Sequence, residues 1–328
     1  MKLIKSLILV TLLSIFAFAD DTKDNKDVLT NLYEKVVLTN VNKTIEDLDK
    51  LKQSVKTKDS IKTKKDFTSV VKSWKSVEAF YILGDLNEDY IDIPRYFDIF
   101  HNNSEDIKKQ LDRAIKSDDK PSIALFKNSF KSINALEYIL YSKDIKNSRV
   151  NLIALTIINR LEDLIKQINN EYKVQEDNFL SDLKRANSIT INTIIQNSYK
   201  LKEWRLGDVI GETKKYEGKP LNSRAEYYLS KNSANAIKSI LLTFQNIFDN
   251  KDYKDYGDYL LEITDGTQIN DLRESIKNSL KLIEDVKNDD FSNSKELYEQ
   301  ISNIHLVLFL EIVEELSINA KIIEADGD

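Results

Sequence analysis

Cysteine is absent from the 328-residue chain, and glycine, proline and histidine are scarce, with 7, 3 and 2 residues. Without cysteine the protein has no disulfide, no thiolate metal site and no lipoprotein anchor. Two histidines exclude a histidine-rich metal cage, and there is no HExxH motif, phosphate-binding loop or nucleophile elbow. Because turns between strands favour glycine and proline, their scarcity predicts long helices joined by short polar loops.

Residues 1–19 have the pattern of an export signal. Lys2 and Lys5 precede an apolar run from Leu7 to Phe16, and Ala17-Phe18-Ala19 matches a small-x-small cleavage site. The run is too short to span a membrane. We therefore expect a signal peptide over 1–19, cleavage after Ala19, and a periplasmic protein with no transmembrane segment in the mature chain.

The overall charge is acidic. The chain carries 48 Lys or Arg and 54 Asp or Glu, a formal charge of -6, and loss of the two lysines in residues 1–19 makes it -8. A negative protein is poorly suited to a phosphate backbone, so we expect no nucleic-acid partner. The same sign argues against an anionic membrane surface and is compatible with cation binding.

Apolar periodicity predicts an all-α fold of two antiparallel four-helix bundles packed together. The expected domains are an N-terminal helical bundle over residues 20–174 and a C-terminal one over residues 175–328. Two longer connections, 85–103 and 207–230, interrupt the helices. The predicted helices cover residues 24–56, 64–83, 104–117, 121–142 and 147–172, then 176–205, 231–250, 269–289 and 293–323.

Glu137 is the sharpest anomaly in this pattern, because it replaces a hydrophobe in an apolar stripe. Asn134 lies one turn earlier on nearly the same face of the predicted helix 121–142. A carboxylate in a core stripe needs a cation, an arginine or several hydrogen bonds. The alternative is a stripe edge from which Glu137 reaches solvent. The other members of the stripe are Ile123, Phe126, Phe130, Ile133 and Leu140.

Glu78, His101 and His305 are weaker candidates. Glu78 shares a helix face with Trp74, although an equally good apolar stripe leaves it beside the core. His101 follows an acidic and aromatic stretch, where it can be a ligand, an acid/base group or an anchor for the loop. His305 lies among apolar residues and is expected to be a packed, hydrogen-bonded core histidine.

Several segments resemble the imelysin family in the same order along the chain. Lys131 to Leu140 (KSINALEYIL) resembles the segment that carries the family's GxHxxE signature, and Trp74 to Gly84 resembles its Trp-and-Glu helix. Arg205-Leu206-Gly207-Asp208 resembles its Arg-Leu-Gly turn. The segment around Glu226 resembles its Glu-Ser element, and Asp326-Gly327-Asp328 resembles its acidic tail.

The resemblance implies paired helical bundles with a site between them, a link to bacterial iron acquisition and, for some members, classification as metallopeptidases. One departure matters. Ser132 and Asn134 stand where the signature has glycine and histidine, and Glu137 alone matches. An asparagine can offer a carbonyl oxygen to a hard cation, but it cannot act as an imidazole base or a soft ligand.

Three functions remain open at this point. The first is metal handling for iron uptake through an oxygen-rich site near the domain junction, with Glu137, Asn134, Glu78, His101 and Glu226 as candidate ligands. Iron is the expected ion, with calcium or zinc not excluded, and envelope proteins of an iron-uptake system are the expected partners. The second is a metallopeptidase with Glu137 as base or ligand. The third is a non-catalytic envelope module that binds a peptide or a glycan.

Overall fold

The protein is helical throughout the residues that the computed structural model describes, which are 23–102, 105–264 and 266–315, and these residues contain no strand. The predicted all-α class is confirmed. The expected signal peptide and the tail residues 326–328 lie outside the described residues. A continuous cluster of buried apolar side chains, from Val28 to Ile312, fills both halves of the chain.

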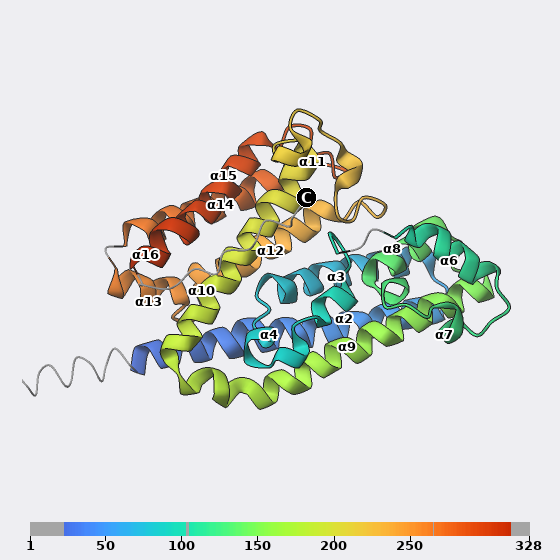
Figure 1. Ribbon diagram of the computed structural model, residues 1–328, viewed down its shortest axis with the longest axis horizontal. Coiled ribbons are helices and arrows are strands. Elements are labelled where there is room, and N and C mark those ends of the chain that lie inside the picture. Colours follow the sequence, from blue (N-terminus) through green and yellow to red (C-terminus); the bar gives the residue numbers. More distant parts are fainter. Residues whose placement is uncertain (1–22, 103–104, 265, 316–328) are drawn as a thin grey trace, which may run out of the picture.

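Long helices form the frame of the N-terminal half (Figure 1). A helix that starts at residue 23 continues through the π-helical segment η1 (Leu32–Leu38) into α2 (Thr39–Lys56). It packs against α3 (Ser60–Ala79) and α9 (Ser148–Ser181). The short elements between α3 and α9 are α4 (Leu83–Leu86), η2 (Glu88–Tyr90), α5 (Ile93–Phe97), α6 (Ile107–Lys116), α7 (Pro121–Ala124), η3 (Ser129–Lys131) and α8 (Ile133–Ser142).

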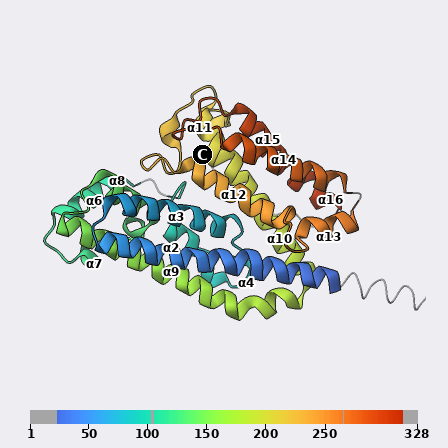
Figure 2. The same cartoon turned by 180° about the vertical axis from the view of Figure 1, so that it is seen from behind.

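The C-terminal half is a second group of helices, and its α12 lies on α3 of the first half, as both views show (Figures 1 and 2). Within this half α14 packs against α12 and α15, and α15 packs against α10. The elements are α10 (Leu183–Lys200), η4 (Leu201–Gly207), α11 (Asp208–Ile210), η5 (Lys214–Tyr216), η6 (Asn222–Arg224), α12 (Ser233–Phe248), α13 (Tyr256–Ile263), α14 (Thr267–Ile283), α15 (Lys295–Leu306), η7 (Val307–Ile312) and α16 (Val313–Glu315).

The predicted single helix over residues 121–142 is wrong. α7 ends at Ala124, and a new helix, α8, begins after Ser132. Ser132 has an extended backbone, and its hydroxyl caps α8 by accepting the Ala135 N–H at 3.3 Å. Serine favours such N-cap positions over helix interiors. The stripe therefore does not exist as one face, and Ile123 and Phe126 are 60% and 69% exposed.

The predicted boundary between residues 174 and 175 falls inside α9, which continues to Ser181. The break between α9 and α10 comes at Asp182, whose side chain caps α10 by accepting the Arg185 N–H at 3.0 Å. Apolar residues on both sides of 174 keep the helical spacing, so the helix has no reason to end there. The division into two domains stays a prediction.

Candidate functional site

Lys75 is the centre of a charged cluster between the two halves. Its side chain is fully buried on α3, and its Nζ lies 2.6 Å from Glu78 Oε2 and 2.6 Å from Asp98 Oδ2. It also pairs with Glu226. We call these three carboxylates the acidic triad (Glu78, Asp98 and Glu226); one oxygen of each lies within 4.8 Å of the others.

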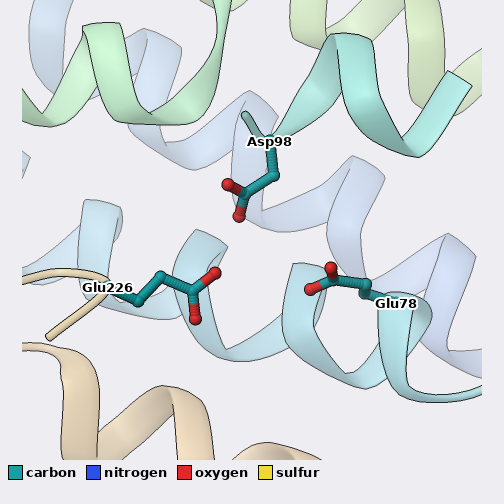
Figure 3. Close-up of side chains that lie close together, drawn as sticks. All are labelled: Glu78, Asp98 and Glu226. Carbon is teal, nitrogen blue, oxygen red and sulfur yellow. The ribbon is translucent and has the colours of Figure 1, made fainter. Parts of the chain in front are cut away.

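The acidic triad is assembled from three separate segments, and its carboxylates point toward one another (Figure 3). Glu78 lies on α3 about one turn after Lys75, and Asp98 directly follows α5. Glu226 belongs to the long connection before α12. The two irregular connections, 85–103 and 207–230, therefore each bring one carboxylate to a cation on a rigid helix.

Packing and hydrogen bonds fix the segment that carries Asp98. The Phe97 ring stacks on Trp74 with ring centroids 3.8 Å apart. Asp98 Oδ1 accepts the Phe100 N–H at 3.0 Å, and Asn134 Oδ1 accepts the Ile99 N–H at 2.9 Å. Asn134 is thus an anchor for this segment, and its amide oxygen is directed to the Ile99 N–H.

Arg205 links the two halves through the acidic triad. It lies in η4, and its Nη2 is 2.8 Å from Glu78 Oε2 while its Nε is 3.0 Å from Glu226 Oε2. The Tyr227 hydroxyl donates to Asp98 Oδ2 at 2.8 Å. Groups from α3, η4 and both long connections therefore share one buried network of charge-assisted hydrogen bonds.

Gly207, two residues after Arg205, ends η4 in a helical conformation at a position with no room for a side chain. A Cβ on Gly207 would lie 2.8 Å from Thr213 Cγ2 and 2.9 Å from the Lys202 carbonyl oxygen, closer than real Cβ contacts. The Gly207 carbonyl also accepts the N–H groups of Gly211 and Glu212. The Arg-Leu-Gly segment is therefore helical, and it needs glycine at its third position for lack of space.

The network has more buried negative than positive charge. Burial lowers the pKa of Lys75, but Asp98, Glu226 and Glu78 outweigh burial and hold it above its usual value. Burial raises the pKa of Glu78, yet Arg205 and Lys75 bring it well below its usual range. For Glu226, burial raises the pKa more than Arg205 and Lys75 lower it, and the resulting pKa is about 7. A proton on Glu226 therefore offsets the third negative charge near neutral pH.

Glu137 is buried, with 5% exposure, and the partner of its carboxylate is a backbone N–H group and not an arginine. Its Oε1 accepts the Ser230 N–H at 2.9 Å. Burial raises the pKa of Glu137 to about 7; the hydrogen bonds from Ser230 oppose this, and nearby Asp98 and Glu226 add to it. The carboxyl group is a neighbour of the acidic triad and carries a proton during part of the physiological pH range.

The histidines lie away from the acidic triad. His101 Nε2 is 3.2 Å from Asp208 Oδ2, and its ring stacks on Trp204 with centroids 4.8 Å apart, so His101 anchors its loop to the C-terminal half. His305 Nδ1 lies 2.9 Å from Ser198 Oγ, and burial lowers its pKa to about 4. The expected hydrogen bond of His305 is confirmed, and its ring packs on Phe309, but the residue is half-buried and not fully inside the core.

Of the five predicted ligands, the structure brings Glu78 and Glu226 together, while Asn134, Glu137 and His101 have other partners. Sequence reasoning missed Lys75 and Asp98. Lys75 and Glu78 lie three residues apart in a helix rich in buried residues. Opposite charges at that spacing lie on the same face of a helix and can pair, so this spacing could have indicated a buried ion pair. Nothing local distinguishes Asp98 from other acids.

The sequence matches the imelysin family model over residues 30–308. The chain belongs to the imelysin family. A search of curated proteins finds no match.

Solved structures of imelysin-type proteins share the fold. An imelysin-like protein from Psychrobacter arcticum is 15% identical with a TM-score of 0.76, covering 92% of this chain and 98% of that one. A protein from Parabacteroides distasonis, described as an iron-regulated protein A precursor, is 11% identical with a TM-score of 0.68, covering 90% of this chain and 95% of that one.

Among the described residues, no helix is both long enough and apolar enough to cross a membrane.

Proposed function

We propose that this imelysin is a periplasmic, non-catalytic protein that binds a metal cation, with iron the expected ion, in the service of iron acquisition. The observation that carries the proposal is the convergence of Glu78, Asp98 and Glu226 on one cation position. Three carboxylates from separate segments face two cations, Lys75 and Arg205, so the site carries a surplus negative charge whenever Glu226 is ionised. The description of the Parabacteroides protein as iron-regulated is the support for iron.

The donors fit a hard cation. Carboxylate oxygens suit Fe(III), calcium or magnesium better than zinc, which prefers nitrogen and sulfur ligands. Lys75 stands where such an ion would be held, so the ion has to exchange with the ammonium group. Glu78, with 19% of its side chain exposed, is the carboxylate from which an ion would enter, because Asp98 and Glu226 are 2% exposed.

The peptidase alternative has less support. A catalytic metal needs an open coordination position beside a positioned base. Asn134 cannot serve as that base, and it already accepts the Ile99 N–H. His101 contacts Asp208, and Glu137 contacts Ser230, so neither reaches the acidic triad. The third hypothesis, a module for a peptide or glycan, is not favoured by a specific observation.

Cation exchange with Lys75 can be tested by unfolding the protein in urea with and without Fe(III), calcium or zinc. A ligand at a hundred times its dissociation constant stabilises a protein by about 2.7 kcal/mol. We expect Fe(III) to stabilise the native protein, and to stabilise Lys75→Met more strongly because the competing ammonium is gone. Asp98→Asn and Glu226→Gln should each weaken the response.

Lys52→Met is the control, because Lys52, which is partly buried, is likewise paired with a buried carboxylate, that of Glu162, at 2.6 Å. Its response to Fe(III) should equal that of the native protein. If no cation stabilises the native protein, or if Lys75→Met alone responds, Lys75 excludes metal from the acidic triad and the proposal is wrong.

A further inference from the structure

The charge of the molecule is unevenly distributed along the fold. Residues 56–65 contain five lysines and one aspartate, and residues 106–149 contain ten Lys or Arg and six Asp or Glu. These two stretches therefore carry a formal charge of +8, against -6 for the whole chain, which leaves -14 for the remainder. An acidic protein thus contains a strongly basic region.

The basic stretches lie together at one end of the N-terminal half. Lys58 Nζ donates to the Lys146 carbonyl at 3.2 Å, and Lys143 pairs with Asp112 at 2.6 Å. In both views α6, α7 and α8 gather at the end of α9 opposite to α4 (Figures 1 and 2). We call this region, residues 56–65 and 106–149, the basic end.

Two hollows mark the surface of the basic end. The larger, about 510 Å³, lies along α6 and is lined by four cations and two acids: Lys108, Lys109, Arg113, Lys116, Asp106 and Asp112. The second, about 270 Å³, is lined in part by Lys64, Tyr141 and Lys143. Lys143 lines the second hollow and pairs with Asp112 of the first, so the two adjoin. The first hollow, with four cations against two acids, suits phosphate oxygens, and the second adds two lysines and the acid Asp144 beside it.

Large apolar side chains project from the same end. Ile61, Ile123 and Phe126 are 86%, 60% and 69% exposed, and each has a lysine within a few residues along the chain. A single exposed apolar residue is ordinary, but apolar side chains among lysines are typical of proteins that rest on a membrane surface. There the apolar groups enter the interface while the cations contact the headgroups.

We propose that the basic end docks on a bilayer surface of anionic phospholipids. Lysine and arginine side chains of α6 and of the α2–α3 turn contact headgroup phosphates, and Ile61, Ile123 and Phe126 enter the interface. The acidic remainder of the chain is repelled by the same surface, so the protein is oriented with its C-terminal half away from the lipid. The apolar side chains favour lipid over a nucleic acid, whose phosphate backbone offers them no burial.

The test is sedimentation with vesicles of phosphatidylcholine, with and without phosphatidylglycerol. The chain used lacks residues 1–19, whose apolar run would itself enter lipid and which lie outside the described fold. Binding should require phosphatidylglycerol and should weaken as NaCl rises from about 0.05 M to about 0.5 M, because salt shortens the Debye length. Neutralising α6 with Lys108→Gln, Lys109→Gln, Arg113→Gln and Lys116→Gln should weaken binding at least about tenfold.

The matched control neutralises four exposed lysines of the C-terminal half, with Lys277→Gln, Lys281→Gln, Lys287→Gln and Lys295→Gln. It changes the net charge equally and should leave binding within about twofold, because cations far from the surface contribute little. Phe126→Ser with Ile123→Ser should also weaken binding. Equal loss in the control, equal binding to phosphatidylcholine alone, or binding to DNA but not to vesicles would overturn the proposal.

Discussion

Glu137→Gln should make the protein less sensitive to pH. Burial raises the pKa of Glu137 from 4.5 to about 7 in the folded protein. The folded state therefore holds the proton more tightly than the unfolded state, so stability is lost as pH rises from 4.5 through 7. Each pKa unit corresponds to about 1.4 kcal/mol, so the full loss is about 3 kcal/mol. A glutamine keeps an oxygen for the Ser230 N–H and has no charge to lose.

Urea unfolding of both proteins at about pH 5 and about pH 8 measures this directly. From the lower to the higher pH, the free energy of unfolding of Glu137→Gln should rise by roughly 2–3 kcal/mol relative to that of the native protein. Titrating groups that do not interact with Glu137 cancel in this comparison because both proteins contain them; Asp98 and Glu226, which do interact with it, are responsible for part of the difference. The exposed Glu299, changed to Gln, is the control and should show no such gain. If Glu137→Gln and the native protein lose stability in parallel, the carboxyl group does not titrate in a buried setting and the reasoning fails.

Three further predictions concern the network and its surroundings. Arg205→Met should lower the free energy of unfolding by about 3–5 kcal/mol, because it removes one of the two cations paired with the buried carboxylates of Glu78 and Glu226. The same change at the exposed Arg95 should cost less than about 1 kcal/mol in the same urea titration. Gly207→Ala should cost about 1–3 kcal/mol through crowding against Thr213 and the Lys202 carbonyl, and an unchanged urea midpoint would contradict the geometry. His305→Gln should reduce the loss of stability on acidification from pH 6.5 toward pH 4, since burial lowers the pKa of His305 to about 4 and the folded state resists protonation; an unaltered acid-unfolding profile would count against it.

The long helices could be predicted from the sequence because their apolar spacing is regular over many residues. The errors arose where local capping outweighed periodicity. Ser132 starts a new helix inside the predicted helix 121–142, and Asp182, not residue 174, separates α9 from α10. Both residues are good N-caps, so closer attention to capping would have corrected both boundaries.

The site was harder to predict because its cations and acids come from distant segments. Glu78 and Glu226 were expected ligands, but the sequence does not reveal that Lys75 lies between them. Glu137 was expected to be buried, and it is, although the apolar stripe used as the reason does not exist. The net charge of -6 argued against an anionic membrane surface, but a sum over the whole chain does not show how charge is distributed, and it hides the positive charge of the basic end.

The metal content of native protein, isolated from the bacterial envelope without chelator, tests the central claim most directly. We expect one iron per chain in the native protein and a large loss of iron in Asp98→Asn and in Glu226→Gln, with the Lys52→Met control unchanged. Native protein that carries no more metal than these two variants would contradict the account, and would leave the acidic triad as an ion-pair network that joins the two halves through Lys75 and Arg205.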